Sequence, residues 1–183
     1  MVFRFSRTDI PDVILIKPEV HYDQRGFFLE SYIKKYFEEA GINEEFVQDN
    51  HSFSIKNTLR GLHYQIEPFE QSKLVRCISG EIIDVAVDIR RNSGTFGKFV
   101  MVNLSSENKN MLYIPRGFAH GFLVISDYAE VVYKTDNYYS REHERGILWN
   151  DYDIGVRWPV PDPIISDKDK SWPRLRDLKG EMH

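Results

Sequence analysis

With 183 residues, of which 42% are hydrophobic and 14% aromatic, the chain has the composition of a globular protein rather than a disordered one. The net charge of −4, with acidic and basic residues interspersed, argues against a nucleic-acid-binding protein. No stretch approaches the roughly 18 apolar residues of a membrane span, and the N-terminus lacks the apolar core of a signal peptide. The single cysteine, Cys77, cannot form an internal disulfide, so we expect a reducing, cytoplasmic environment.

Short segments rich in β-branched and aromatic residues fill the chain between residues 13 and 137. Gly, Pro, Asn or Ser separates many of them, as expected for strands joined by turns. The expected strands cover residues 13–20, 26–32, 62–65, 73–80, 81–90, 98–105, 110–115, 120–126 and 129–137. Strands at this density predict a mainly β fold, either a sandwich or a barrel.

One helix is expected early in the chain, over residues 31–41. Ser31 is suited to its N-cap, and Gly41 to the position after its C-terminus. Helical spacing gives it an apolar face made of Ile33, Tyr36, Phe37 and Ala40. This pattern predicts a helix that packs one side against the β structure.

The tail after Pro159 is rich in Pro and Asp, and short helices are expected within residues 166–178. No internal repeat, low-complexity tract or linker divides the chain. We therefore expect a single domain over residues 1–183, with N-terminal strands and a C-terminal tail packed on a core barrel that spans about 45–160.

Several expected strands direct a titratable side chain from an otherwise apolar context. These side chains are His63, Asp84, His120 and Tyr133. Because side chains alternate along a strand, His63 shares its face with Gly61 and Gln65, as a cavity wall would require. If the strands close into a barrel, the titratable groups can converge on its interior.

The segment "PRGFAH" (115–120) resembles the second conserved motif of the cupin superfamily, whose members are small jelly-roll β-barrels. Metal-binding cupins generally carry a first motif of the form H-x-H, followed by a Glu and then a Gly. Here the first motif reads "HYQ" (63–65), so the second His is missing. The resemblance therefore implies a jelly-roll barrel with an altered pocket.

The residue in the position of the cupin Glu decides whether a metal can bind. Counting forward from the first motif leads to Glu70, whereas counting back from the turn at Gly80 leads to Lys73. We favour Lys73, because it belongs to the same strand and turn as Gly80. A lysine repels a divalent cation, and His63 with His120 alone makes a poor site, so we expect no metal. The chain also lacks a cofactor-binding glycine loop, so we expect no cofactor.

Proton transfer is the chemistry that this set of residues suits. His63 is a candidate base, and Lys73 can stabilise an oxyanion that forms beside a carbonyl group. Tyr133 can act as an acid and return a proton. A base and an acid on opposing walls would invert a carbon next to a ketone through an enolate, so the pattern predicts an epimerase.

Other residues suit a phosphate and a nucleobase. Arg25 and Arg60 can each make bidentate phosphate contacts. The segment "QDN" (48–50) offers amides that can contact a base edge, and Tyr138 and Tyr139 offer a stacking surface. Together they indicate a nucleotide-bearing ligand.

The segments "DQRGFFLE", "FVQDNHSFS", "LRGLHYQ", "QSKLVR", "GEIIDVAVDIRRNSGTFGKF", "IPRGFAHGF", "YKTDNYYS", "GILWNDYDIGVRWP" and "ISDKD" occur in this order over nearly the whole chain. Together they resemble the dTDP-4-dehydrorhamnose 3,5-epimerase family. The resemblance implies a cofactor-free jelly-roll enzyme that inverts C3 and C5 of dTDP-4-dehydro-6-deoxyglucose, the two carbons that flank the C4 ketone. It also implies a homodimer in which N-terminal strands reach across to the partner's site.

The resemblance assigns roles to individual residues. It implies His63 as the base, paired with Asp169. It implies Tyr133 as the acid and Lys73 as the group that faces the keto oxygen. The implied substrate-binding residues are Arg25, Glu30, Gln48, Asp49, Asn50, Arg60, His120, Tyr139, Glu144 and Lys168, with Tyr139 stacking on thymine.

The sequence leaves two local alternatives open. Asp169 matches the family's partner for the base, but residues 166–169 also fit an S-x-x-D capping box, in which Asp169 would only begin a helix. Strict alternation puts Arg60 and His63 on opposite faces of their strand, whereas a bulge at Gly61 would bring both to one site.

Three other functions compete with the double epimerase. A relative of the same fold could invert only C3 or only C5, or move the ketone between C3 and C4. A metal-dependent cupin oxygenase would use His63, Glu70 and His120. A module that only binds sugar nucleotides would need no base and acid in one cavity.

Overall fold

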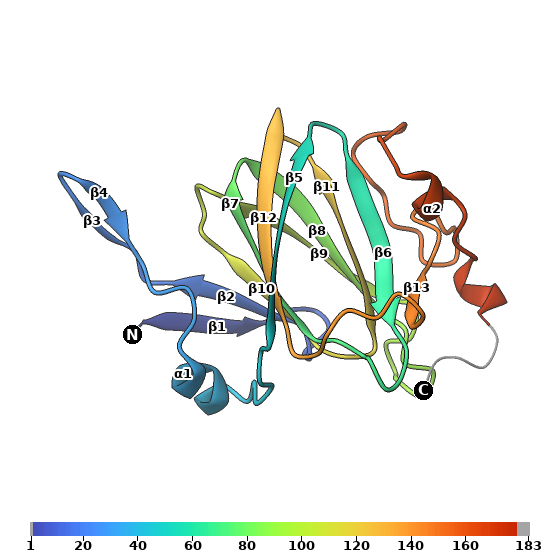
Figure 1. Ribbon diagram of the computed structural model, residues 1–183, viewed down its shortest axis with the longest axis horizontal. Coiled ribbons are helices and arrows are strands. Elements are labelled where there is room, and N and C mark those ends of the chain that lie inside the picture. Colours follow the sequence, from blue (N-terminus) through green and yellow to red (C-terminus); the bar gives the residue numbers. More distant parts are fainter. Residues whose placement is uncertain (1, 179–183) are drawn as a thin grey trace.

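The computed structural model describes residues 2–178, which are mainly β (Figure 1). Antiparallel strands form two large sheets and a small separate hairpin. The strands are β1 (Phe3–Arg7), β2 (Ile14–Pro18), β3 (His21–Asp23), β4 (Gly26–Phe28), β5 (Gln48–Ile55), β6 (Leu59–Gln65), β7 (Lys73–Ser79), β8 (Glu81–Asp88), β9 (Phe99–Ser105), β10 (Met111–Ile114), β11 (Phe118–Val124), β12 (Tyr128–Thr135) and β13 (Glu144–Gly146).

The strands from β5 to β12 pair as four antiparallel couples: β5 with β12, β6 with β11, β7 with β10 and β8 with β9. Successive couples alternate between a six-stranded sheet, of order β1-β2-β10-β7-β12-β5, and a five-stranded sheet, of order β13-β6-β11-β8-β9. A two-stranded ribbon wound in this way is a jelly roll. The expected fold class is therefore confirmed, with β1 and β2 extending one sheet.

The space between the sheets changes from apolar to polar along the strands. On β12 the inward side chains begin with the buried Ala129 and Val131 and continue with Tyr133. On β7 the inward side chains are the buried Cys77 and Val75 followed by Lys73, which lies toward the same end of the sheet as Tyr133. One end of the jelly roll is thus a closed hydrophobic core, and the other end offers polar and titratable groups.

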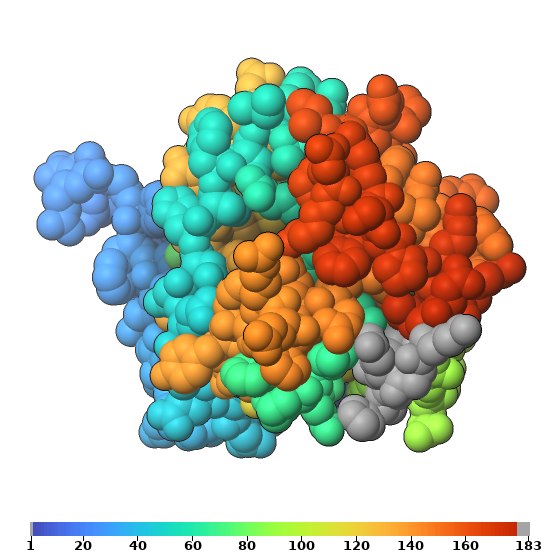
Figure 2. Space-filling model, turned by 45° about the vertical axis from the view of Figure 1, so that its right-hand side comes forward, coloured from blue at the N-terminus to red at the C-terminus, as the bar shows by residue number. Residues whose placement is uncertain are grey.

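The outer face of the five-stranded sheet is also buried. Leu62 on β6 and Val85 and Val87 on β8 pack there against residues of the C-terminal segment, including Leu175. Both faces of β8 are therefore covered, and Asp84, which its strand pattern would also allow at the surface, is fully buried. Figure 2 shows the C-terminal segment (red) lying over this side of the molecule.

The C-terminal segment contains the short helices that the sequence predicts within 166–178. They are α2 (Asp167–Lys170) and the 3-10 helix η1 (Leu175–Asp177). Neither these helices nor α1 (Lys34–Glu39), within the part of the chain that the structure describes, is long and apolar enough to cross a bilayer.

The early helix is shorter than predicted. It covers only Lys34–Glu39, and Ile33 rather than Ser31 occupies the N-cap. Ser31 is wrong as a cap because the chain is still extended at Ile33, and Tyr32 is held by ring contacts with Phe37 and Phe46. Gly41 does follow the C-terminus, with a positive φ of 88°.

The predicted strand over 26–32 is also shorter, because only Gly26–Phe28 is extended and pairs with β3. The resulting β3–β4 hairpin projects away from the body of the molecule (Figures 1 and 2). Its aromatic side chains Tyr22, Phe27 and Phe28 are 71%, 52% and 64% exposed. In a single chain this hairpin contributes nothing to the space between the sheets.

Candidate active site

A cavity of about 270 Å³ opens at the polar end of the jelly roll. Its walls come from both sheets: β5, β7 and β12 of the six-stranded sheet face β6 and β13 of the five-stranded sheet. The side chains that line it are Gln48, Asn50, His63, Tyr64, Gln65, Gln71, Lys73, Tyr133, Tyr139 and Glu144. Half of the residues that the sequence predicts for a site, including the candidate base, acid and lysine, thus share one cavity.

His63 forms a close pair with Asp169. The His63 Nε2 lies 2.7 Å from Asp169 Oδ1, and the Asp169 side chain is 4% exposed. Burial alone would raise the pKa of Asp169, but hydrogen bonds from His63, from the Gly61 N–H and from Trp172 Nε1 hold it below its ordinary value. Asp169 is therefore ionised at neutral pH, and it orients the imidazole.

Asp169 also begins helix α2, so both interpretations of the 166–169 segment hold together. Ser166 is the N-cap, and its Oγ accepts a hydrogen bond from the Asp169 N–H at 3.1 Å. The cap uses the backbone of Asp169, whereas His63 uses its carboxylate. The cap and the pair with His63 therefore use different atoms of Asp169.

A bulge in β6 brings Arg60 and His63 into register with β11. His63 lies opposite His120 and Arg60 lies opposite Phe122, so two residues of β6 face the single Gly121. Gly61, one of the two, has a φ of 129°, in the region that favours glycine. The shift of one residue turns Arg60 toward β5, where its Nε donates to Ser54 Oγ at 2.9 Å.

Lys73 lies on the wall across from His63 and is only 9% exposed. Burial lowers its pKa to about 8, while the negative charges of Asp84 and Glu144 oppose this effect. At neutral pH the side chain therefore remains largely an ammonium group. A desolvated cation of this kind can stabilise negative charge that develops on a substrate oxygen.

A second buried pair, His120 and Asp84, lies behind Lys73 and His63. His120 Nε2 lies 3.0 Å and 3.1 Å from the two Asp84 oxygens, and the Asp84 side chain is fully buried. Burial lowers the pKa of His120, and the neighbouring Lys73 and His63 lower it further. The negative charge of Asp84 and its hydrogen bond to His120 oppose this shift. His120 is thus neutral at pH 7 and donates to the carboxylate.

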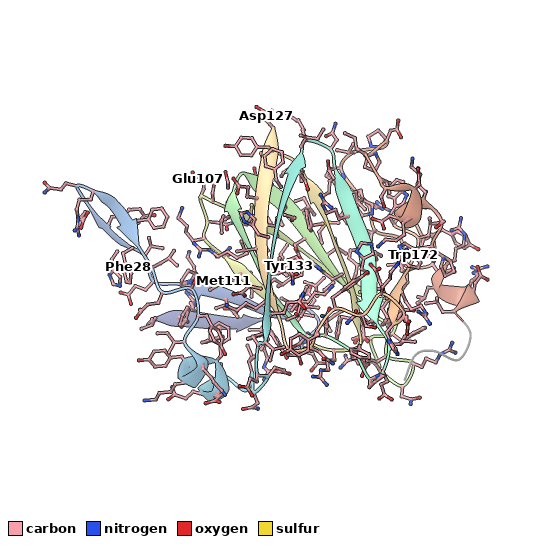
Figure 3. The ribbon with its side chains drawn as sticks, viewed as in Figure 1. Phe28, Glu107, Met111, Asp127, Tyr133 and Trp172 are labelled. Carbon is pink, nitrogen blue, oxygen red and sulfur yellow. The ribbon has the colours of Figure 1, made fainter. Side chains whose placement is uncertain are left out.

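Tyr133 faces the cavity from β12, on the sheet opposite His63. Figure 3 labels it on this wall and labels Trp172 on the C-terminal segment across the molecule. Burial raises the pKa of the Tyr133 phenol, with the charge of Arg60 acting against this shift. The phenol therefore keeps its proton at neutral pH and can act as an acid.

Glu144 bonds to two other predicted site residues at the cavity mouth, Lys168 and Tyr139. Its Oε1 accepts from Lys168 Nζ at 2.7 Å, and its Oε2 accepts from the Tyr139 hydroxyl at 2.8 Å. Burial opposes the charge of Glu144, but these two hydrogen bonds keep its pKa below the ordinary value. Tyr139, which is 53% exposed, is positioned here as an open aromatic surface.

The residues 48–50 do not all reach the cavity. Gln48 and Asn50 line it, and their amides bond to each other at 2.9 Å. Asp49 lies on the opposite face of β5, where it accepts from Lys134 Nζ at 2.9 Å. Neighbours on a strand point to opposite faces, so the Asp49 side chain does not line this cavity, and its role as a substrate contact stays a prediction.

The other predicted contacts that do not line the cavity are Arg60, His120, Lys168, Arg25 and Glu30. The first three bond to Ser54, Asp84 and Glu144, whereas Arg25 and Glu30 lie farther along the N-terminal part of the chain. Arg25 is in the hairpin turn, 85% exposed in its side chain, and pairs with Asp23 at 2.6 Å. Glu30 follows β4 and does not line the cavity either. We call residues 21–30, which are the β3–β4 hairpin and the two residues after it, the arm.

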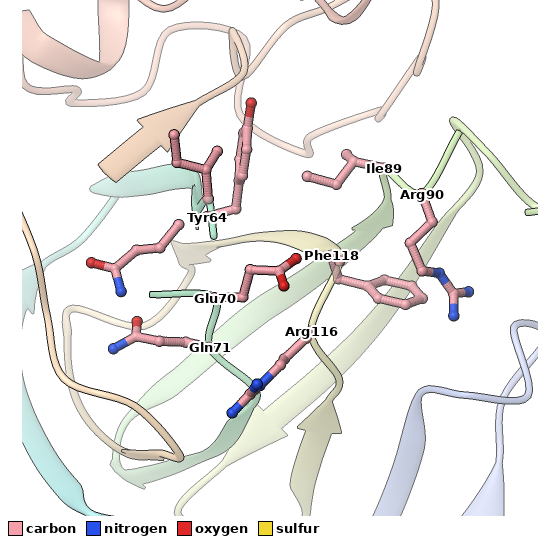
Figure 4. Close-up of a pocket in the computed structure, with 10 residues that line it drawn as sticks. Tyr64, Glu70, Gln71, Ile89, Arg90, Arg116 and Phe118 are labelled. Atoms are coloured by element: carbon pink, nitrogen blue, oxygen red, sulfur yellow. The ribbon is translucent and has the colours of Figure 1, made fainter. Parts of the chain in front are cut away.

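Glu70, the alternative metal ligand, does not join the two histidines. It lines a neighbouring hollow of about 230 Å³ that also contains Arg90 and Arg116 (Figure 4). Lys73 is the residue that lines the cavity with His63, in agreement with the count from Gly80. Within residues 2–178, no cluster of three or more His, Cys, Asp or Glu side chains has a geometry that could hold a metal ion.

Sequence reasoning missed Trp172 and the roles of two glutamines. Trp172 donates to Asp169 and meets the His63 ring edge-on at 6.3 Å. Gln65 and Gln71 line the cavity, although they were not predicted as site residues. The position of Gln65 in the altered cupin motif was the available signal for its importance.

Comparison with known proteins identifies the family of the chain. The family model described as dTDP-4-dehydrorhamnose 3,5-epimerase matches residues 7–177. A Shigella flexneri protein of that name is 63% identical over 164 residues, which cover 89% of this chain and 91% of the relative.

Solved structures of two epimerases share the fold of this chain. A dTDP-6-deoxy-D-glucose-3,5-epimerase from Legionella pneumophila, in complex with dTDP-4-keto-L-rhamnose, superposes with a TM-score of 0.93 at 45% identity, covering 96% of this chain and 94% of its own. A 3'-monoepimerase from Streptomyces bikiniensis, in complex with dTDP-quinovose, has a TM-score of 0.87 at 31% identity, covering 93% and 87%. With a family model matched over residues 7–177, a relative 63% identical and the same jelly-roll fold, the chain belongs to the dTDP-4-dehydrorhamnose 3,5-epimerase family.

Proposed function

We propose that this protein is an epimerase that inverts C3 and C5 of dTDP-4-dehydro-6-deoxyglucose and yields dTDP-4-dehydro-rhamnose. The observation that carries the proposal is the distribution of groups around one cavity. The His63–Asp169 pair belongs to one wall, and Tyr133 and Lys73 belong to the opposite wall. A base and an acid on opposite sides of a bound sugar are what inversion at carbon requires.

His63 is the proposed base. Because Asp169 is ionised, the His63 Nε2–H donates to it, and the lone pair of Nδ1 is free to accept a proton. That nitrogen takes the proton from C3 or C5, the C–H bond breaks, and its electron pair moves toward the C4 oxygen. The product of this step is an enolate.

Lys73 is the proposed stabiliser of the enolate oxygen. With a pKa of about 8, its ammonium group holds a proton at neutral pH and can donate it in a hydrogen bond. The low-polarity surroundings that lower this pKa also strengthen the attraction between the ammonium and a developing oxyanion.

Tyr133 is the proposed acid. Its phenol gives a proton to the carbon from the face opposite His63, so the configuration at that carbon inverts. The raised pKa favours the protonated phenol before the step. His63 and Tyr133 then return to their starting protonation states by exchange with solvent, which introduces solvent hydrogen at the inverted carbon.

The nucleotide end of the substrate is proposed to lie near Tyr139, with thymine stacked on its exposed ring. Gln48, Asn50, Glu144 and Lys168 surround the same mouth of the cavity. Arg60 provides a cation for a phosphate, and His120 contacts the sugar side. These assignments follow the family resemblance and the positions of the side chains.

We further propose that the active form is a homodimer. The β3–β4 hairpin presents Arg25 and three exposed aromatic rings, and none of its residues lines the cavity of its own chain. In a dimer it reaches the partner's cavity, where Arg25 and Glu30 complete the nucleotide site. The free thiol of buried Cys77 is in keeping with a reducing, cytoplasmic location. Neither a nucleic acid nor a membrane has a part in this proposal.

The test is isotope uptake by the purified protein. Incubation with dTDP-4-dehydro-6-deoxyglucose in deuterated water, followed by mass spectrometry and NMR, should give deuterium at both C3 and C5 and the L-configured product. Deuterium at one carbon only would identify a single-centre epimerase, as in the similar 3'-monoepimerase. Tight binding of dTDP with no deuterium uptake would identify a binding module, and activity that is lost to a chelator would favour a metal-dependent enzyme.

A further inference from the structure

The loop that carries Tyr139 is held on both sides by one buried glutamine, Gln65, which is 7% exposed. Gln65 Nε2 donates to the carbonyl of Tyr138 at 3.1 Å, just before Tyr139. Gln65 Oε1 accepts from the N–H of Ser140 at 2.6 Å, just after it. The same Nε2 also donates to the carbonyl of Phe69 at 2.6 Å. All these partners are backbone groups.

Two further glutamines bind the same loop from other directions. Gln48 Oε1, on β5, accepts from the N–H of Tyr139 itself at 3.1 Å. Gln71 Nε2 donates to the carbonyl of Asn137 at 2.7 Å. Thus each residue from 137 to 140 has a backbone group bonded to the amide of a glutamine on the cavity wall, and Gln65 contributes two of these bonds.

We propose that Gln65 is a positioning residue, which fixes the loop so that the Tyr139 ring is already in place when the nucleotide binds. The proposal rests on the proposed function, because it assumes that Tyr139 stacks on the base. It also explains the altered cupin motif: the third position of "HYQ" holds the loop instead of a metal ion.

A primary amide is the group that this position requires. It offers two donors and one acceptor on a single planar end, which matches two carbonyls and one N–H. A carboxylate would keep the acceptor and lose both donors, and an apolar side chain would lose all three bonds. Ordering the loop before binding removes part of the entropic cost of binding, so its loss should appear in the affinity for nucleotide.

The experiment measures binding of dTDP by calorimetry to the wild type, Gln65→Met, Tyr139→Ala and the double variant. Gln65→Met preserves side-chain volume, and we expect it to raise the Kd for dTDP about 10-fold. In the Tyr139→Ala background the same change should alter the Kd less than about 2-fold. KM should rise with the Kd, while kcat stays within about 3-fold.

Glu142→Ala is the matched control, because Glu142 is an exposed residue just after the same loop and does not line the cavity. It should leave the Kd unchanged. Gln65→Glu, which keeps the acceptor for Ser140, should give a Kd between those of the wild type and Gln65→Met. This second variant serves if Gln65→Met does not fold.

The hydrogen bonds from Gln65 to the loop, which we call the clamp, can be tested separately from the proposed function. The test is hydrogen exchange of the Tyr139 and Ser140 amides without ligand. Exchange should be slow in the wild type and at least about 10-fold faster in Gln65→Met. Unchanged exchange would overturn the proposal, as would an unchanged Kd or an equal loss of affinity with and without Tyr139. If the wild type does not bind dTDP but the exchange result holds, the proposed function fails and the clamp stands.

Discussion

Lys73 illustrates, at the scale of a residue, how a site can reduce stability. The folded protein buries an ammonium group whose pKa falls from 10.5 to about 8. Below pH 8 the folded chain carries this charge at a cost that the unfolded chain does not have. Between pH 8 and 10.5 the cost disappears, because the folded protein can then hold the neutral amine.

Lys73→Met should therefore stabilise the protein at pH 7. The expected gain is on the order of 3 kcal/mol, from the difference between the two pKa values, and it should shrink as the pH rises from 8 to 10.5. Denaturant unfolding at a series of pH values measures it. Lys134→Met, which removes a cation from the outer face of the same sheet, should show no such pH-dependent gain. A destabilised Lys73→Met at pH 7 would contradict the account.

Asp169 combines two roles that mutation can separate. Asp169→Asn removes the charge that orients His63, and we expect kcat to fall about 10²-fold or more. Ser166→Ala removes the cap of the same helix and should cost about 1 kcal/mol of stability, with kcat near that of the wild type. Steady-state kinetics and thermal melting of both variants check this. Equal losses of kcat would show that the helix, not the carboxylate, is what matters.

The β6 bulge is the feature at the scale of an element on which the site depends. A Cβ added to Gly61 would lie 2.5 Å from Gly121 Cα and 2.8 Å from the carbonyl oxygen of His120. Both contacts are with backbone, which cannot rotate away, and the φ of 129° is itself unfavourable for other residues.

Gly61→Ala should consequently reduce the free energy of unfolding by at least about 2 kcal/mol and lower activity by displacing His63 from its register. Gly94→Ala is the matched control, since an added Cβ at Gly94 meets nothing within 4 Å. Chemical denaturation of both variants gives the comparison. A Gly61→Ala protein as stable as the wild type would disprove the importance of the bulge.

The sequence predicted most of the central strands because their inward faces are apolar. It missed β5, whose inward side chains Gln48, Asn50, Ser52 and Ser54 are polar. A strand that lines a cavity at the edge of a sheet lacks the hydrophobic alternation that reveals a core strand. β13 was also missed, because a strand of three residues is too short to show an alternation and is defined only by its pairing with β6.

The candidate site residues on predicted strands could be foreseen, whereas those positioned by other parts of the chain could not. His63, Lys73 and Tyr133 share a cavity as predicted, because strand alternation fixes the direction of a side chain once the sheets are known. Trp172 could not be predicted, since its contact with Asp169 depends on how the C-terminal segment lies on β6. The position of Asp49 was missed because β5 itself was missed.

At the scale of the whole molecule, the proposed dimer predicts that two inactive variants complement each other. His63→Ala lacks the base, and Arg25→Ala lacks the arm's phosphate contact. A mixed dimer contains one cavity with a wild-type His63 that receives a wild-type arm. After unfolding and refolding a 1:1 mixture, random pairing should restore about a quarter of the wild-type activity.

Each variant refolded alone is the control and should remain poorly active. If the arm served the cavity of its own chain, every cavity in the mixture would carry one defect, and no recovery would occur. Light scattering should give twice the mass of a chain for the wild type, and a monomeric active protein would likewise contradict the dimer.

The central claim is that His63 and Tyr133 act on opposite faces of one bound sugar. Deuterium uptake by His63→Ala and Tyr133→Phe, measured separately at C3 and C5 against net inversion, tests it most directly. His63→Ala should lose uptake at both carbons. Tyr133→Phe should retain uptake at a reduced rate but lose most of the inversion, because the proton can then return only from the side it left. Normal inversion by Tyr133→Phe, or uptake by His63→Ala at the wild-type rate, would contradict the account.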